Sequence, residues 1–419
     1  MKKVVALVLS LLLCGVFFMP TVTYAEEKTK IVMWDFWTEG IGAGFYNFWN
    51  EKIAQYNEMH PNVEIERVLV PQDEYLGSKL TTAFATDSGP DIFFASAAIM
   101  KPFLDADVAA PLNQYFSEEV LADIIPSSLE LCTRDGIIYG VPWQSDLVAL
   151  YYDKDILEEA GVEPPKTWNE LKEVAEKVNT DLVSGFTFDI TAGDWQLFTF
   201  YPFVWQGGGD LFDENGYPQL DSEPVVNALT LWHDLLASGA SNESLSRICG
   251  EIGIIGDGET AMQINGSWSV PTLETVYADR NIGVVPLPIP DVGGKAATVA
   301  GGWRMMINKK CENIDAAADF IKWLWLDDDV SSIVKWCTEA TFAYPVRLSA
   351  IEQAKDFYSV NLRAVFTEQI NETSKPELAL DGTMNEIVSD MIQDALYNMT
   401  PTEAAKKAQE RAVTAYNGQ

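Results

Sequence analysis

The sequence predicts an α/β protein whose chain folds into two compact lobes. Strand-like and helix-like segments alternate over the first hundred residues, and the same alternation returns further on. A chain of 419 residues is also longer than a single hydrophobic core usually organises. Because no repeat, low-complexity tract or flexible linker interrupts it, we expect several passages between the lobes rather than one tether.

The first five segments are predicted to be a strand, a helix, a strand, a helix and a strand, in that order. They are predicted at residues 30–36, 44–60, 63–69, 73–86 and 91–95. Pro61 stops the first helical pattern. A βαβαβ order of this kind predicts a parallel sheet with right-handed crossovers.

Two capping boxes mark helix starts later in the chain, at Thr167 with Glu170 and at Thr400 with Glu403. The first helix should end near Asn179 and the second near Tyr416. The other predicted segments are strands at 147–152, 183–189 and 282–285, and a helix at 222–238 that Gly239 closes.

The N-terminus has the pattern of a secretory signal peptide. Two lysines precede an apolar run at residues 4–19, and the small residues Thr23 and Ala25 predict cleavage after Ala25. We therefore expect a periplasmic or extracellular protein. A lipoprotein anchored through Cys14 is the alternative, although Leu13 is too bulky for the usual lipid-attachment pattern.

Charge and composition exclude several classes of function. With 62 acidic and 28 basic side chains the formal net charge is −34, which excludes nucleic acid as a partner and disfavours anionic ligands, but not neutral sugars. The only histidines, His60 and His233, lie in helical patterns, so neither a metal site nor a cofactor is predicted.

Four cysteines lie beyond the signal peptide, and their spacing matches no zinc or redox motif. Both disulfides and free thiols are possible for these residues, which are Cys132, Cys249, Cys311 and Cys337.

Nine short segments, in this order along the chain, carry a resemblance to a known family. They are IVMWDFW (31–37), GPDIF (89–93), GIIYGVP (136–142), LYYDKD (150–155), EEAG (158–161), PPKTWNEL (164–171), GETAM (258–262), NGSW (265–268) and VVPLP (284–288). The chain resembles the bacterial extracellular solute-binding proteins of the sugar-binding family that includes the maltose-binding protein. The cysteines and the weak lipid-attachment pattern depart from that family.

The resemblance implies a two-lobed periplasmic-binding-protein fold of type II, with about three chain crossings, a ligand cleft between the lobes and closure by hinge bending. It places residues 26–140 with 299–340 in lobe 1 and residues 141–298 with 341–419 in lobe 2, after a signal peptide at 1–25. It also implies the permease subunits of an ABC transporter as partners, and a monomer. Two facing α/β sheets independently predict a concave site at their interface.

A sugar site needs flat aromatic faces for C–H surfaces and polar groups for hydroxyls. Residues near strand ends or on the expected crossings are therefore the candidates. These are Trp37, Glu39, Trp143, Asp146, Trp195, Trp205, Asn265, Trp268, Gly302, Trp303, Tyr344 and Arg347.

Each candidate has a structural alternative. The aromatic residues could pack in the core, Asp146 could be a solvated loop charge, and Arg347 could pair with an acid. Trp195 and Trp205 are expected to flank a helix that begins after Asp189. Four other tryptophans, inside helical patterns, are predicted to be core: Trp49, Trp232, Trp323 and Trp325.

We expect a binding protein for a mono- or oligosaccharide, and not an enzyme. A binding protein for a polyamine or another non-sugar solute is the alternative in the same class. A secreted glycoside hydrolase is the alternative in another class, since it too needs aromatic faces and two carboxylates. The pattern lacks the eightfold repeat of a barrel, which disfavours the hydrolase.

Overall fold

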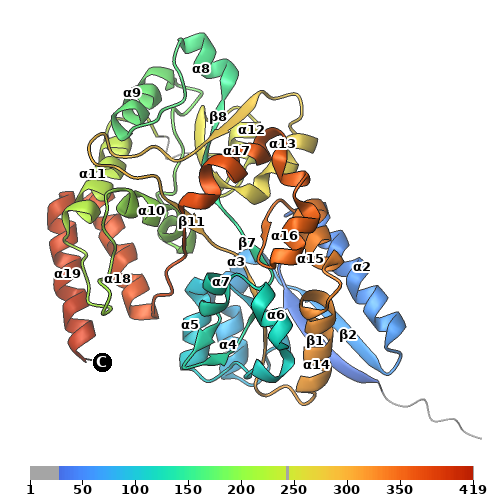
Figure 1. Ribbon diagram of the computed structural model, residues 1–419. Helices are drawn as coiled ribbons and strands as arrows, with labels where there is room; N and C mark the ends of the chain where they lie inside the picture. Colours follow the sequence, from blue (N-terminus) through green and yellow to red (C-terminus); the bar gives the residue numbers. More distant parts are fainter. Residues whose placement is uncertain (1–27, 242–244, 419) are drawn as a thin grey trace, which may run out of the picture.

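The computed structural model describes residues 28–241 and 245–418, and Figure 1 shows them as two lobes joined near the middle of the molecule. The predicted signal peptide, with its cleavage site and Cys14, lies outside the described residues. Among the helices of the described part, none is both long and apolar enough to cross a membrane.

A five-stranded sheet forms the centre of the first lobe, in the order β2-β1-β3-β12-β6. Strands β1 (Thr29–Asp35), β2 (Val63–Leu69) and β3 (Ile92–Ala95) are parallel, as the opening pattern predicts. Strands β12 (Arg304–Ile307) and β6 (Val141–Pro142) complete the sheet in antiparallel pairings. Since β12 comes from far along the sequence, the chain must return to this lobe after building the second one.

Of the two helices predicted beside this sheet, the one at 44–60 is confirmed and the one at 73–86 is the exception, and several further helices surround them. They are α2 (Ala43–Met59), α3 (Gln72–Glu74), η1 (Tyr75–Lys79), α4 (Leu80–Ala85), α5 (Ala97–Asp105), η2 (Asn113–Tyr115), α6 (Glu118–Asp123), α7 (Pro126–Glu130), α14 (Ile314–Ile321), η4 (Lys322–Leu326), α15 (Ser331–Lys335), η5 (Trp336–Ala340) and α16 (Leu348–Ala354), with a small hairpin of β4 (Thr133–Arg134) and β5 (Ile137–Ile138).

The exception is the helix predicted at 73–86, which is broken at Gly77. The backbone there has φ −81° and ψ −126°, which glycine adopts at little cost. Just before the break, the Tyr75 hydroxyl donates to the carbonyl of Phe94 (3.0 Å) and accepts from its N–H (2.8 Å). This anchor fixes the first turn on the sheet, and the chain restarts as α4.

The second lobe contains an antiparallel three-stranded sheet in the order β10-β8-β9. Its strands are β8 (Val148–Asp153), β9 (Met262–Gly266) and β10 (Ile282–Val285). The strand predicted at 183–189 is wrong, since this segment makes only isolated bridges. Its backbone divides its hydrogen bonds between two neighbours, because the N–H of Phe186 reaches Ala240 whereas that of Thr187 reaches Met262.

The other helices surround this second sheet (Figure 1). They are α8 (Lys154–Ala160), α9 (Trp168–Val178), α10 (Asp194–Gln206), α11 (Glu223–Ala237), α12 (Gly253–Gly256), η3 (Ser267–Ser269), α13 (Val270–Thr275), η6 (Phe357–Ser359), α17 (Asn361–Val365), η7 (Phe366–Ile370), η8 (Asn371–Thr373), α18 (Gly382–Gln393), η9 (Asp394–Asn398) and α19 (Pro401–Gly418). Both capping boxes are confirmed, and Gly239 follows α11 with φ +75°.

Two main hydrophobic cores match the two sheets. One draws on residues 31–143 and 305–350, and the other on residues 148–299 and 380–412. A smaller core joins the far face of β8 to Phe342, Tyr358 and Phe366. The lobe boundaries predicted near 140, 298 and 340 stay a prediction, although the first core continues as far as Ala350.

Three of the four tryptophans predicted to be core are buried: Trp49, Trp232 and Trp325. Trp323 is only half-buried and packs beside Tyr56, 5.5 Å between ring centres. The structure also shows whether the four cysteines of the described chain form disulfides. Cys132, Cys249, Cys311 and Cys337 are all free thiols.

Candidate ligand-binding site

Segments that pass between the lobes lie side by side at the junction. The first runs from β6 through β7 (Gln144–Ser145) to β8, and the second from β11 (Thr298–Ala300) to β12. The N–H of Gly301 donates to the carbonyl of Asp146 at 2.9 Å, and β7 also pairs with β13 (Tyr344–Pro345). The crossings therefore form one hydrogen-bonded ribbon between the two sheets.

Glycine at position 302 is required by this close approach. Its φ is +127°, in the region that favours glycine, and a Cβ there would lie 2.5 Å from the carbonyl oxygen of Gln144. At the neighbouring Gly301 an added Cβ would lie 2.7 Å from the ring of Phe198. The Gly-Gly pair thus lets one crossing pack against both the other crossing and α10.

Asp146 lies in the middle of the ribbon and is buried, with 5% of its surface exposed. Gln144 Nε2 donates to its Oδ2 at 2.6 Å, while Oδ1 has no hydrogen-bond partner among the described residues. Burial raises the pKa of Asp146 to about 7, although Gln144 and the charge of Arg304 act in the opposite direction. A buried oxygen without a partner is costly, and a ligand hydroxyl can satisfy it.

Two further charged residues at the junction were missed from the sequence. Arg304 opens β12, donates from Nη1 to the carbonyl of Gly302 (2.6 Å), and leaves Nε without a partner in the described chain. Glu377 follows β14 (Ser374–Pro376), and its N–H donates to Ala300 at 3.1 Å. Burial raises the pKa of Glu377 to about 7, with the charge of Arg304 opposing the rise. A lone arginine in an apolar strand after Gly-Gly-Trp could have indicated Arg304; no sequence signal marks Glu377.

An aromatic wall extends from the junction into the second lobe. Trp268, on η3, meets Trp195 edge to face with ring centres 5.7 Å apart, and both side chains are half-buried. Trp195 in turn stacks on Phe198 at 5.7 Å, the ring that touches Gly301. Burial also raises the pKa of Asp194, next to this wall. Partly exposed indole faces beside carboxylates are what a sugar ring needs.

Asn265 supports this wall from behind. Its Oδ1 accepts from the N–H of Gly266 (2.8 Å) and from Ser269 Oγ (2.7 Å), and its Nδ2 donates to the carbonyl of Gly250 (3.1 Å). The side chain is fully buried. In this structure Asn265 fixes the turn that carries Trp268.

On the first lobe, Trp303 is the aromatic candidate that stays partly exposed. It packs on Phe36 (4.8 Å between ring centres) and on Trp37 (5.9 Å). Trp37 itself is only 3% exposed and belongs to the aromatic core, whereas Glu39 is exposed in the turn after β1.

The remaining aromatic candidates have side chains that are buried in packing. Trp143 is fully buried and stacks on Trp325 at 5.1 Å. Tyr344 is buried and shares a hydrogen bond with Thr367 Oγ1 (2.7 Å). Trp205 is buried and donates from Nε1 to Asp210 (3.1 Å).

The expectation that Trp195 and Trp205 flank a helix is wrong, because both lie inside α10. That helix begins at Asp194, directly after an extended Gly193 with φ 157°. Trp195 therefore falls in the first turn, at the junction end, and Trp205 in the last turn, within the second core.

Arg347 pairs with an acid rather than staying free. Its Nε donates to Asp123 Oδ2 and its Nη1 to the carbonyl of Asp327, both at 2.6 Å, and 5% of the residue is exposed. We expect Arg347→Met to lower the unfolding free energy by about 2 kcal/mol, because the backbone carbonyls of Trp325 and Asp327 lose a charged donor, while the partly exposed Asp123 loses its ion pair. The matched control is Lys310→Met, whose pair with Asp87 is exposed and should contribute less than about 1 kcal/mol. Equal denaturant midpoints for the two variants would contradict this assignment.

The two-lobed fold is shared with solved structures of other proteins. A solute-binding protein of Thermotoga lettingae with bound α-D-tagatose shares the fold with a TM-score of 0.79 at 24% identity, covering 92% of this chain and 99% of that one. A maltose-bound protein of T. maritima gives the same TM-score and identity, over 92% and 100% of the two chains.

The chain belongs to the family described as bacterial extracellular solute-binding protein, whose model matches residues 42–329. A maltotriose-binding protein of Pyrococcus abyssi is 28% identical over 289 residues, 66% of this chain and 59% of that protein. An arabinooligosaccharide-binding protein of Halalkalibacterium halodurans is 23% identical over 412 residues, 92% of this chain and 89% of that protein. The chain thus spans about three fifths of the first relative and nearly all of the second.

Proposed function

We propose that this protein captures a mono- or oligosaccharide outside the cytoplasmic membrane and delivers it to the permease of an ABC transporter. The observation that carries the proposal is the junction itself. There one buried carboxylate oxygen of Asp146 has no hydrogen-bond partner among the described residues. Asp146 pairs with Gly301, which lies against Phe198, and Phe198 stacks on Trp195 of the aromatic wall.

This arrangement fits a neutral sugar in two ways. The Asp146 carboxyl group accepts hydrogen bonds from hydroxyls when it is ionised and can also donate one when it is protonated, so with a pKa of about 7 it suits ligand hydroxyls in either state. Half-buried indoles offer apolar faces to the C–H surface of the ring. The relatives named for maltotriose and arabinooligosaccharides support the same class of ligand.

The alternatives fit the junction less well. A polyamine would meet the guanidinium of Arg304, which is 3% exposed and acts electrostatically on both Asp146 and Glu377. A glycoside hydrolase would cleave a glycosidic bond of the sugar that it binds, whereas the family is one of binding proteins. We therefore propose a non-catalytic, monomeric carrier, exported to the periplasm or the cell exterior.

A calorimetric screen of neutral oligosaccharides and polyamines tests the proposal. We expect one neutral sugar to bind with micromolar affinity, about −8 kcal/mol, and to be recovered intact after incubation. Tight binding of a polyamine without any sugar signal would overturn the ligand class. Accumulating hydrolysis products would instead move the protein to the hydrolases.

A further inference from the structure

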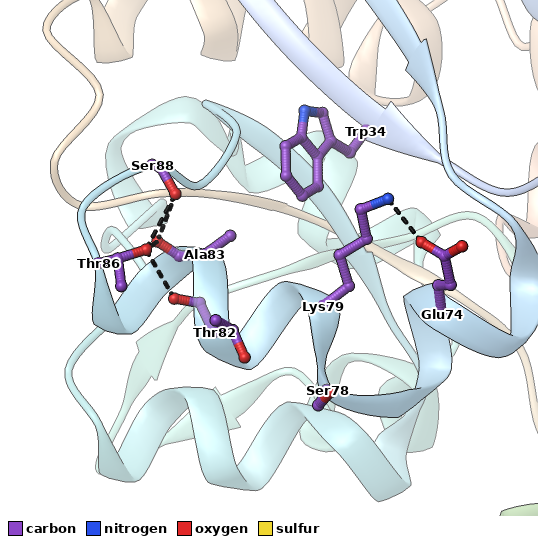
Figure 2. Close-up of a pocket in the computed structure, with 8 residues that line it drawn as sticks. All are labelled: Trp34, Glu74, Ser78, Lys79, Thr82, Ala83, Thr86 and Ser88. Atoms are coloured by element: carbon purple, nitrogen blue, oxygen red, sulfur yellow. Dashed lines mark hydrogen bonds and ion pairs between the residues drawn. The ribbon is translucent and has the colours of Figure 1, made fainter.

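A hollow of about 450 Å³ lies on the first lobe, between β1 and the helical segment of α3, η1 and α4 (Figure 2). None of its lining residues belongs to the chain crossings or to the aromatic wall of the junction. Small-molecule sites typically have volumes of roughly 300 to 1,000 Å³, so this hollow is large enough for a small ligand.

The indole of Trp34 forms one side of the hollow. Met33 and Asp35, its neighbours on β1, are buried on the opposite face of the sheet, whereas Trp34 is half-buried. One part of its ring packs against the first core, beside Val68 of the paired strand, and another part lines the hollow. The ring is thus held by the sheet and still presents an accessible apolar surface.

The helical segment leaves space beside this ring. Its break at Gly77 interrupts the segment where it passes the sheet, and α4 then presents only the small side chain of Ala83 to the hollow among its apolar residues. A longer apolar side chain at position 83 would occupy that space. The free surface of the indole therefore depends on a small residue facing it.

The polar lining is rich in hydroxyls and has no net charge. Ser78, Thr82, Thr86 and Ser88 contribute hydroxyl groups. Those of Thr86 and Ser88 lie 3.0 Å apart and also contact backbone carbonyls of the same turn, so each offers mainly an acceptor to a ligand. Lys79 Nζ contacts Glu74 Oε2 at 2.7 Å, so the one cation and the one anion of the lining neutralise each other. A lining of this kind disfavours nucleotides and polyamines, and it suits a neutral ligand with several hydroxyls.

We propose that this hollow is a second carbohydrate-binding site, which takes a single glycosyl unit stacked on Trp34. The hydroxyls of Thr82, Thr86 and Ser88 and the paired Glu74 and Lys79 form hydrogen bonds to the ring substituents. Because most of these groups are exposed, the site is weak, with an affinity in the millimolar range, and it is independent of the junction site.

The test follows the indole N–H resonance of Trp34 by NMR on the full exported chain, with maltotriose as the probe. Its peak is assigned by its loss in Trp34→Phe. We expect this resonance to shift at millimolar sugar, and Ala83→Met, which fills the space beside the indole, to weaken the response at least tenfold. The matched control is Thr81→Met, because Thr81 is exposed on the same helix and does not line the hollow. This substitution should leave the response of the Trp34 resonance to maltotriose unchanged.

Two outcomes overturn the second site: a Trp34 resonance that does not move with maltotriose, or one that shifts equally in Ala83→Met. A shift with spermidine or adenosine monophosphate in place of the sugar would overturn the ligand class. Trp268→Ala should leave the Trp34 response intact, so failure of the junction site and failure of this second site are read separately.

Discussion

The unfolding free energy of the unliganded protein should fall as the pH rises from 5 to 8. Asp146 and Glu377 both have pKa values raised to about 7 by burial, so between roughly pH 4 and pH 7 the native state binds more protons than the unfolded state. Stability that depends on a raised carboxyl pKa is fully present below the unfolded pKa and is lost as the pH passes the folded one. A shift of about three pKa units for Asp146 alone corresponds to a loss on the order of 4 kcal/mol.

The matched variants are Asp146→Asn and Glu377→Gln, which cannot ionise. Denaturant titrations of the double variant should show a flatter pH profile than the native sequence, and a higher unfolding free energy at pH 8. Every other ionisable group of the chain is present in all the variants, so the difference between profiles isolates the two carboxyls. A native profile as flat as that of the double variant would show that these groups ionise normally.

Trp143→Ala should destabilise the protein by about 3 to 5 kcal/mol, as loss of a large core aromatic does. The indole is fully buried, stacks on Trp325 at 5.1 Å and meets Phe94 and Trp336 edge to face at 5.8 Å. The alanine variant would leave a cavity lined by rigid aromatic rings that cannot collapse. Thermal and denaturant unfolding measure the effect.

Trp303→Ala is the control for this substitution. Its indole is half-buried and packs on the same cluster through Phe36 and Trp37, so a smaller loss of about 1 to 2 kcal/mol is expected. Should Trp143→Ala unfold like the native protein while losing ligand affinity, its ring would contact ligand directly and the packing described for the first core would be wrong.

Much of the fold could be predicted because local patterns and tertiary packing agree. The strands at β1, β2 and β10 and the capped helices α9 and α19 follow from periodicity and end signals. Two errors came from tertiary contacts that the sequence does not display. The helix predicted at 73–86 is broken close to the point where Tyr75 is hydrogen-bonded to Phe94. The segment at 183–189 is not a strand, because its backbone hydrogen bonds go to two different neighbouring segments.

The site was harder to predict because exposure decides it, and exposure is a tertiary property. Trp143 and Trp268 have the same chemistry and both follow a strand, yet one is buried among rings and the other is partly exposed. Arg347 and Asp146 are both charged residues on or near crossings. Arg347 is hydrogen-bonded to Asp123 and Asp327, whereas Oδ1 of Asp146 has no hydrogen-bond partner among the described residues. Glu377 reaches the junction through the pairing of β14 with β11, which sequence spacing does not indicate.

The most direct test of a sugar site at the lobe junction is calorimetry on Trp268→Ala beside the native protein, with unfolding of each unliganded form measured in parallel. Removing a half-buried aromatic face that stacks on a sugar should cost on the order of 1 to 3 kcal/mol of binding. We therefore predict an affinity about tenfold weaker or more, at 1.4 kcal/mol per decade, and a nearly unchanged unfolding free energy. A loss of several kcal/mol of stability with affinity preserved would show that Trp268 is packing, and would contradict the placement of the ligand at the junction.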